Sequence, residues 1–505
     1  MYISDLELIK EKLSVEGRLS TSDIIKKIIE DDTGNPQKAF MSIGERYYDG
    51  DHDILRHDFR RSTIYEDDAN GNPVGREFEN ENNSNHHNVH NFHQQHVDQK
   101  VAYISGRPAS VTVEGAEDNA ELKTFEDMIT AVTSDEEFSD TLSDLETGAS
   151  NKGVEWLHVY YDKSGNFQYV IVPAEGCIPL YDTQYQKELV EMIRYYEIAV
   201  VRPGGDVIRK HVEWWTASDV SHYTEDDNGE YIFERRLPHW YGITSIDERE
   251  VRREGHGWGR VPFIPLYNNS RQMSDLTRNK GLIDAYNLIS SSSTNNQIDL
   301  VELYFMIQGY GGETAKAIQQ KLKINKAVSV SDPNGKIQAQ QVSLDVSDRL
   351  EWLKMLRRDI YHLGMAIDTD DETFGSAPSG VALKFKYTQL DLKSDKMIVK
   401  LKKAMKEFFW FLTEDLNRKN NTVYDASLVR FDANKSMITN DLETVQIISQ
   451  SQGLVPDTLL LAKHPYVDDV NQAIKELKKQ KREEAEAYSS YERMTPGGGG
   501  DGDAE

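Results

Sequence analysis

The sequence predicts an α+β protein built from several parts, and three observations support this. Residues 153–267 contain aromatic and β-branched runs separated by Gly and Asn turns, which is typical of antiparallel strands. Residues 380–417 carry apolar side chains at alternating steps of four and three, with no Pro or Gly after Gly380, which predicts one very long helix. Between them, residues 301–345 alternate short strand and helix patterns.

Composition favours several packed domains in a reducing, aqueous compartment. The chain has 505 residues, of which 38% are hydrophobic, enough for more than one core. Its net charge of -27 argues against tight generic binding to DNA or anionic membranes, because phosphate affinity comes from Lys and Arg that displace counterions. Cys177 is the single cysteine, the start lacks a signal-peptide pattern, and no apolar run reaches the roughly 18 residues of a membrane helix.

The first 150 residues predict mainly helices. Ser22 followed by Asp23 marks a helix start, and Gly34-Asn-Pro marks the turn after that helix. A polar loop is expected over 67–75, where Asn-Gly-Asn-Pro interrupts the pattern. Further along we expect a helix that ends at Gly106 and Pro108, a strand over 109–113, and an acidic helical stretch over 120–147.

Five histidines in Asn-rich surroundings raise the possibility of a metal site: His86, His87, His90, His93 and His96. Steps of three and four would put several of them on one helix face, where imidazoles can bind a transition metal. The alternative is a polar helix face that uses His and Asn. We favour it because no acidic residue or cysteine sits at a spacing that completes a ligand set. We therefore assign no catalytic residue, no cofactor site and no metal ligand.

The β-rich part should be a meander of antiparallel strands, and half-buried sheet faces explain its Trp and Tyr residues. Behind it, 255–269 is interpreted as a rigid connector with two prolines. Two helices, over about 270–299 and 347–367, should bracket the insert. The first ends in a polar run, 290–297, that either frays or lies against other polar surfaces. Inside the insert we expect strands at 301–307, 327–330 and 337–342 and a helix at 313–323.

An acidic loop rich in small residues, Asp368–Ser379, leads from the second bracketing helix into the long helix. After the long helix we expect a strand at 425–431, helices at 440–450 and from Pro456, a charged helix at 468–488, and a disordered tail from Pro496.

The order and spacing of several segments over about 370 residues match those of a known family, although no single segment is diagnostic. These segments are Val97–Pro108, Gly257–Leu266, Ser379–Leu383, Phe408–Leu412 and Asp441–Pro465. Together they resemble the portal (head-to-tail connector) proteins of tailed double-stranded-DNA bacteriophages, of the siphophage type. The histidine cluster and the polar run 290–297 are not required by that family.

The resemblance implies a portal fold with a wing, a two-helix stem, a small α/β clip, a long kinked helix behind a tunnel loop, and an α-helical crown. It divides the chain into a wing (1–269), stem helices (270–300 and 346–367), a clip (301–345), a tunnel loop (368–379), a long wing and tunnel helix (380–419), a crown (420–488) and a disordered tail (489–505).

The resemblance also implies a homo-oligomeric ring, usually of twelve subunits, made in the host cytoplasm and built into one vertex of the virion capsid. Double-stranded DNA would pass through it without sequence specificity. The expected partners are the terminase large subunit, a head-completion or adaptor protein, the scaffolding protein and the major capsid protein. No enzymatic activity, cofactor or membrane is implied.

Three groups of site residues follow from the resemblance. The tunnel-loop candidates are Asp368, Asp370, Asp371, Glu372, Thr373, Phe374, Gly375, Ser376 and Ser379, with Gly380 as a hinge. The clip-interface candidates are Tyr304, Tyr310, Lys321 and Lys323. The lysines that could face DNA are Lys384, Lys386, Lys393, Lys396 and Lys400.

An acidic excess suits a passage that must not hold its cargo, because carboxylates repel phosphates and release no counterions. The eight lysines between Val381 and Lys406 are a local exception that could form weak rings of positive charge. Alternatively they are the solvated face of an amphipathic helix, or they pair with carboxylates of the next subunit. A metal-dependent enzyme using His86–His96 and another kind of capsid-associated structural protein are the remaining functional alternatives.

Overall fold

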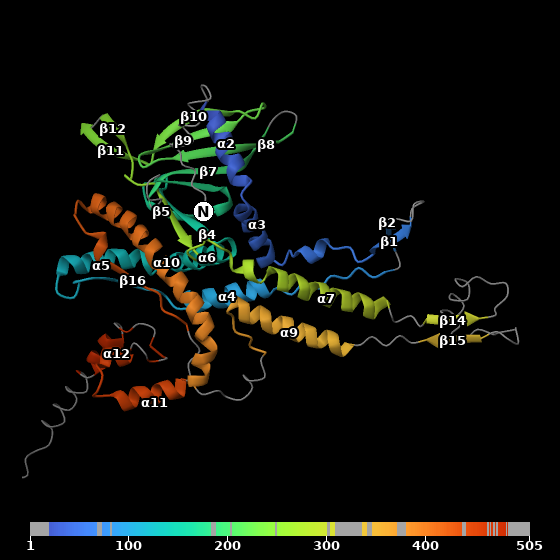
Figure 1. Cartoon of the computed structure of the whole chain (residues 1–505). Coiled ribbons are helices and arrows are strands. Elements are labelled where there is room, and N and C mark those ends of the chain that lie inside the picture. The colour runs from blue at the N-terminus through green and yellow to red at the C-terminus, as the bar shows by residue number, and fades with distance from the viewer. Residues whose placement is uncertain are drawn as a thin grey trace, which may run out of the picture. The chain divides into compact units, whose positions relative to one another are not determined.

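Figure 1 shows a computed structural model of the chain. The structure describes residues 20–67, 73–80, 83–182, 188–201, 205–247, 250–299, 304–308, 336–340, 346–370, 380–436 and 441–461, with short pieces between 464 and 482. The chain divides into two compact units, one of residues 1–368 with 389–436 and one of residues 369–388 with 437–505. The mixture of helices and antiparallel strands confirms the predicted α+β class.

The first helices begin at residues whose side chains cap them. Ser20 and Asp23 form a capping box at the start of α2, and Asn35 caps α3, which has Pro36 as its first residue. The helices are α2 (Thr21–Thr33), α3 (Pro36–Tyr48), α4 (Phe92–Ser105), α5 (Ala120–Thr133), α6 (Glu136–Lys152), α7 (Lys280–Asp299), α9 (Val346–Gly364), α10 (Gly380–Asn420), α11 (Asp441–Ser451) and α12 (Asp457–Leu461). Single 3-10 turns are η1 (Asp53–Arg56), η2 (Ala174–Gly176), η3 (Asp275–Arg278) and η5 (Ala426–Leu428).

Every strand ladder that the structure describes is antiparallel. The predicted antiparallel strands are confirmed, but they divide between two sheets instead of forming one meander. The larger sheet has the order β10-β9-β8-β7-β6 and is made of β6 (Cys177–Tyr181), β7 (Leu189–Val200), β8 (Val207–Trp215), β9 (Asp219–Glu225) and β10 (Tyr231–Pro238). A second sheet has the order β13-β4-β5, made of β4 (Val154–Tyr161), β5 (Phe167–Val172) and β13 (Phe263–Tyr267).

Four two-stranded ladders complete the described strands. They pair β1 (Arg61–Asp67) with β2 (Pro73–Glu79), β11 (Trp240–Asp247) with β12 (Glu250–His256), β14 (Tyr304–Gln308) with β15 (Lys336–Gln340), and β16 (Val429–Asp432) with β3 (Ser110–Val113). The β14–β15 ladder confirms two of the expected insert strands. The helix expected at 313–323, the strand at 327–330 and the tail from Pro496 lie outside the described residues.

The structure corrects several expected boundaries. The connector 255–269 contains β13, and Pro265 fits there because β13 is an edge strand of its sheet. The polar loop at 67–75 is bordered by the strands of the β1–β2 hairpin, which was not expected. The acidic stretch 120–147 is two helices, because Asp135 accepts a hydrogen bond from the Glu137 N–H and starts a second one.

The helix expected from residue 270 begins ten residues later, as α7. Asn269 Oδ1 accepts hydrogen bonds from the backbone N–H groups of Arg271 and Met273, and Ser274 Oγ accepts one from Leu276. These side-chain bonds hold the backbone in turns, and turns compete with helix formation. Among the described helices, none combines the length and apolar character that crossing a bilayer requires.

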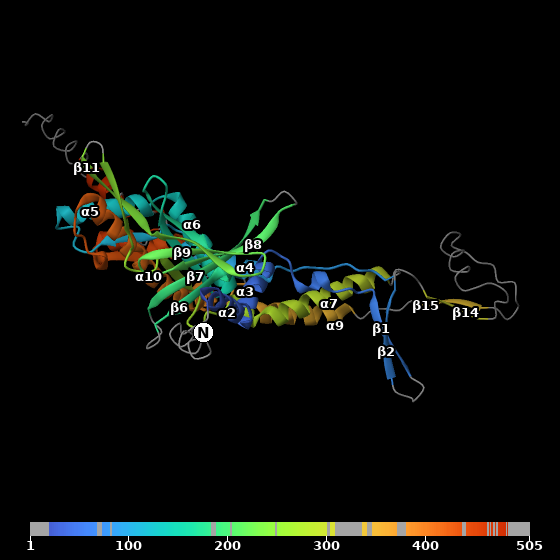
Figure 2. The same ribbon diagram turned by 90° about the horizontal axis from the view of Figure 1, so that it is seen from above.

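The described residues form four buried apolar clusters, and three of them position the elements that matter most here. The largest packs the apolar face of α10 from Met397 onward, including Phe408, against α6 and the β13-β4-β5 sheet. Another packs α2 on one face of the five-stranded sheet. A third joins α7 and α9, through Ile283 and Ile360, to Tyr47 and Phe92. Figures 1 and 2 both show α7 and α9 side by side, as expected for the two helices that bracket the insert.

Candidate functional site

The long helix and its approaches form the candidate site. α10 is one continuous helix of 41 residues that begins at Gly380, so the expected kink is not marked by a break in the helix. Of the loop before it, Asp368 and Asp370 are described; Asp371, Glu372, Thr373, Phe374, Gly375, Ser376 and Ser379 lie outside the described residues. Of the expected clip residues, the backbone of Tyr304 lies in β14, and Tyr310, Lys321 and Lys323 lie outside.

The first residue of the loop is fixed to α9. Arg357 donates two hydrogen bonds to the Asp368 carboxylate, from Nε at 2.9 Å and from Nη2 at 2.7 Å. Such a two-point guanidinium–carboxylate contact fixes orientation as well as distance. The chain that follows α9 is therefore held in a defined position at Asp368.

The side chain of Lys393 points inward, so this lysine does not belong with those that could face DNA. Its side chain is only 13% exposed and pairs with Asp275 at 3.0 Å. Its ammonium also donates a hydrogen bond of 3.0 Å to the carbonyl of Gly364, at the end of α9. Lys393 therefore joins α10 to α9 and to η3.

Asp275 is the centre of a buried ion network that links three elements. Lys100 of α4, which is 0% exposed, donates to its Oδ2 at 2.7 Å, and Asn268 Nδ2 donates to its Oδ1 at 2.9 Å. Burial alone would raise the pKa of Asp275, but the charges of Lys100 and Lys393 outweigh burial and hold it well below its usual range. Burial lowers the pKa of Lys100 to about 8 against the opposing attraction of Asp275.

This network was missed in the sequence, although Lys100 offered a signal. It continues the apolar stripe formed by Val97, Val101 and Ile104 of the same helix, where a charged residue needs a buried partner. Nothing in the spacing of the sequence identifies that partner at position 275.

The other lysines of α10 differ in their surroundings. The side chain of Lys384 lies outside the described residues, Lys386 and Lys400 are half-buried, and Lys396 is exposed. The two acids of this stretch, Asp391 and Asp395, both bind Lys435, which lies beyond the helix. Lys396 therefore has neither acid as a partner for its charge.

An apolar stripe shares the exposed side of α10. Leu392 and Val399 are exposed, Val399 by 66%, and they lie seven residues apart. Residues seven apart lie on nearly the same side of a helix. Lys396 and Lys403, also seven apart and exposed, lie along one side of the stripe.

The histidine cluster is not one helix face, because α4 begins only at Phe92. His86–His90 run in a non-helical segment along α7. The N–H of His86 donates to Asn295, that of Asn88 to Ser291 and that of His90 to Asn287, at distances of 2.7–3.0 Å. Two residues of an extended chain advance about 6.6 Å, and four residues of a helix advance about 6 Å. Every second N–H group of the extended segment therefore meets every fourth side chain of α7.

This match explains both unusual segments and corrects the single helix face that both interpretations of the cluster assumed. The polar run 290–297 lies against another polar segment, and its Ser291 and Asn295 accept hydrogen bonds from two backbone N–H groups of that segment. His93 and His96 are buried in α4, and burial lowers the pKa of His93 to about 4 and that of His96 to about 3, so both are neutral at pH 7. In the part of the chain that the structure describes, the group of metal-ligating residues that converges contains none of these five.

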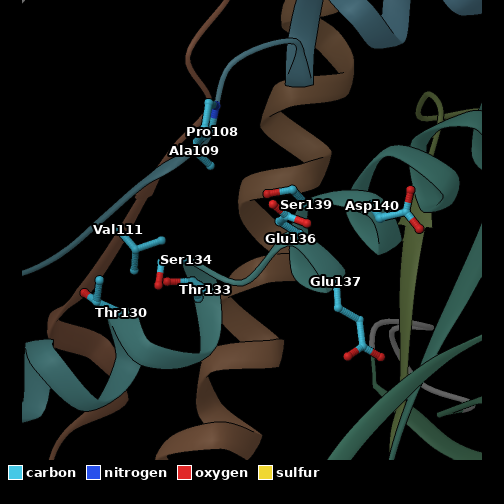
Figure 3. A pocket seen from close by; sticks show the side chains of 10 residues that line it. All are labelled: Pro108, Ala109, Val111, Thr130, Thr133, Ser134, Glu136, Glu137, Ser139 and Asp140. Atoms are coloured by element: carbon cyan, nitrogen blue, oxygen red, sulfur yellow. The ribbon is translucent and has the colours of Figure 1, made fainter. Parts of the chain in front are cut away.

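A cavity of about 980 Å³ lies elsewhere, between the region of β3 and the junction of α5 with α6 (Figure 3). Its lining is Pro108, Ala109, Val111, Thr130, Thr133, Ser134, Glu136, Glu137, Ser139 and Asp140. The three carboxylates lie in the first turns of α6, where the helix dipole stabilises negative charge. The lining combines hydroxyl and carboxylate side chains and includes no histidine, cysteine or cation.

Comparison with known proteins covers nearly the whole chain. A family model described as "Phage portal protein, SPP1 Gp6-like" matches residues 35–487. The chain is 28% identical to a portal protein of Bacillus phage SPP1 over 486 residues, which are 95% of this chain and 90% of that protein. It is 29% identical to a portal protein of Clostridium phage phiCD119 over 420 residues, 79% of this chain and 86% of that protein.

Proposed function

Because this chain belongs to the SPP1 Gp6-like family of phage portal proteins, we propose that its copies form a ring-shaped channel at one capsid vertex. Double-stranded DNA would be packaged through this channel and later ejected through it. The family match across residues 35–487 carries the proposal. In this role the chain is a structural component of the virion, and the functional feature of the ring is its central channel.

The surface of the long helices supports self-association. Trp352 on α9 and Leu392 and Val399 on α10 are exposed although they are large and apolar. Rows of such side chains are typical of surfaces that another protein covers. In a ring, each subunit would cover the helix face of its neighbour through a head-to-tail interface that closes on itself.

The family also suggests roles for the individual parts. Residues 1–269 would be the wing, α7 and α9 the stem, 301–345 the clip, and 420–488 the crown. The clip would dock the terminase large subunit and later an adaptor protein, using Tyr304, Tyr310, Lys321 and Lys323. Asp368–Ser379 would form the tunnel loop, with Gly380 as the hinge of α10. Other surfaces would meet the scaffolding and major capsid proteins.

The ring itself is tested by the mass of the purified particle. Twelve copies of a 57.7 kDa chain would give about 0.69 MDa, seen as an annulus with a central hole in negative stain. Native mass spectrometry gives the subunit number directly. A chain that stays monomeric, both alone and in the presence of capsid and scaffolding proteins, would refute the channel.

We further propose that Lys384, Lys386, Lys396 and Lys400 place weak positive charge near the DNA path. Changing all four to Ala should make DNA retention in filled heads less dependent on salt, because fewer counterions are released for each duplex contact. The measurement is the length of DNA retained per head across a range of salt concentrations. Equal retention by variant and wild type at every salt concentration would rule out a role in DNA contact.

Lys402→Ala is the matched control for these four changes. Lys402 lies two residues beyond Lys400, about 200° around the helix, and pairs with Asp432. Its loss should leave DNA retention unchanged. If the four changes instead prevent the ring from assembling, the lysines pair with the neighbouring subunit, which was the alternative interpretation of the sequence.

A further inference from the structure

Three potential metal ligands converge on one face of the five-stranded sheet. Glu213 of β8 pairs directly with His222 of β9, and His211 lies two residues before Glu213 on the same strand face. All three side chains are buried, and one donor atom of each lies within 4.8 Å of the others. The opposite face of these strands contributes Val212 and Tyr223 to the cluster beneath α2, so this site faces away from that helix.

Hydrogen bonds around His211 determine which ring nitrogen carries its proton. The Thr224 hydroxyl donates to Glu234 Oε1 at 2.6 Å, so toward His211 Nδ1, at 2.9 Å, it can only accept. We therefore assign the proton of His211 to Nδ1, which leaves a lone pair on Nε2. That lone pair faces Nδ1 of His222 at 3.2 Å.

The position of Glu234 is set by a register shift in the sheet. The β9–β10 pairing slips between Phe233 and Arg235, and the extra residue is Glu234, whose carboxylate reaches Thr224. Bulges of this kind often re-aim a side chain beside a functional site. A carboxylate that orients a histidine through an intervening hydroxyl acts as the outer-shell support that metal-binding histidines use.

Glu213 is held in the ionised form that a metal needs. Burial would raise the pKa of Glu213, but Arg194 and the hydrogen bonds from Trp215 and Tyr196 outweigh it and lower the pKa. Tyr196 Oη donates to Oε1 at 3.0 Å, and Trp215 Nε1 donates to Oε2 at 3.1 Å. Oε2 also accepts a hydrogen bond from Arg194 Nη1 at 3.3 Å, so the lone pair that remains for a metal ion is on Oε1.

We propose that His211, Glu213 and His222 bind a divalent transition metal ion, Zn²⁺ by preference. Zinc–nitrogen bonds of about 2.0–2.1 Å in a tetrahedral site place two nitrogens about 3.3 Å apart, close to the observed separation of the two imidazoles. Two nitrogens and one carboxylate favour zinc over the oxygen-seeking Mg²⁺ and Ca²⁺. A water molecule would complete the coordination.

Metal binding would replace the hydrogen bond between the two imidazoles. Without metal, His222 Nδ1–H donates to the lone pair of His211 Nε2. On binding, the proton of His222 moves from Nδ1 to Nε2 through solvent, and both lone pairs then point at the ion. The bound ion would link β8 to β9 at a point deep in the sheet.

The test is metal binding by the full-length protein after treatment with a chelator. Competition with a chromophoric chelator should show one tight Zn²⁺ per chain, and Co²⁺ should give the visible absorption of a four-coordinate site. His222→Gln should weaken binding at least tenfold, and Thr224→Val, which keeps all three ligands, about tenfold. His86→Gln/His87→Gln is the matched control, because it removes two histidines of the N-terminal cluster and should leave binding unchanged.

Three outcomes would overturn the proposal. They are no binding at micromolar Zn²⁺, binding that survives His222→Gln, and binding that is lost in the His86→Gln/His87→Gln control. If His222→Gln fails to fold, X-ray absorption of the zinc-loaded wild-type protein decides the question. Two imidazoles in the zinc shell are expected, and a shell without imidazole refutes the site.

Discussion

Replacing Asp275 with Asn should lower the free energy of unfolding by about 3–5 kcal/mol, the usual cost of breaking a buried ion pair from one side. The change keeps the size of the side chain but leaves two ammonium groups, those of Lys100 and Lys393, without a counter-charge in the interior. Their burial makes this costly, because neither group can recover its lost hydration by turning to solvent.

The pH dependence of the variant separates a lost charge from lost packing. Without Asp275, the folded-state pKa of Lys100 should fall further below the value of an unfolded lysine, about 10.4. Between the two pKa values the unfolded chain binds more protons than the folded chain, so stability rises with pH. The difference in the free energy of unfolding between the wild type and Asp275→Asn should therefore shrink from pH 7 to pH 9, whereas the difference caused by a packing defect would stay constant.

Asp432→Asn is the matched control for this experiment. It removes the same charge from the Lys402 pair, whose two side chains are largely exposed, and should cost less than about 1 kcal/mol. Both variants are compared by scanning calorimetry at one protein concentration and one scan rate, because the midpoint of an assembled protein depends on both. Equal midpoints for the two variants would show that the buried network does not stabilise the fold.

The sequence predicted elements whose signals are local. The apolar spacing from Leu383 to Phe411 repeats with Ser394 as its single polar position, so α10 was found with an accurate start and nearly its full length. The start of α7 was misplaced because Asn269 and Ser274 bind the backbone locally, an effect that apolar spacing does not report. β13 was missed because a proline argues against a strand unless its place at a sheet edge is known.

The candidate sites depend on contacts between distant residues, and these were largely hidden. Positions 100, 275 and 393 meet in one ion network, yet their separation in the chain carries no periodic signal. The histidines were analysed with the period of a helix, while His86 and His90 use the period of an extended chain along α7. His211 and His222 lie in separate strands of the structure, and only the pairing register of those strands brings the two side chains together.

Replacing Phe408 with Ala should also cost about 3–5 kcal/mol, because it opens a cavity where α10 packs on the sheet. Phe408 is 0% exposed, and its ring centroid lies 5.6 Å from Phe138, 5.9 Å from Phe167 and 5.4 Å from Tyr169. These neighbours come from α6 and β5, so one side chain joins the long helix to two layers. Phe408→Leu should lose less, since it keeps most of the volume and gives up mainly the aromatic contacts.

Phe385→Ala on the same helix provides the control and connects stability with assembly. Phe385 is 75% exposed, so truncating it should leave the thermal midpoint of the separated subunit unchanged. If the exposed side of α10 meets a neighbour in the ring, the same change should weaken assembly, measured as the concentration at which rings dissociate. Phe408→Ala should instead lower the thermal midpoint of the separated subunit, because its effect is on the fold of the subunit itself. Equal effects of the two changes on subunit stability would contradict the assignment of a buried and an exposed face to this helix.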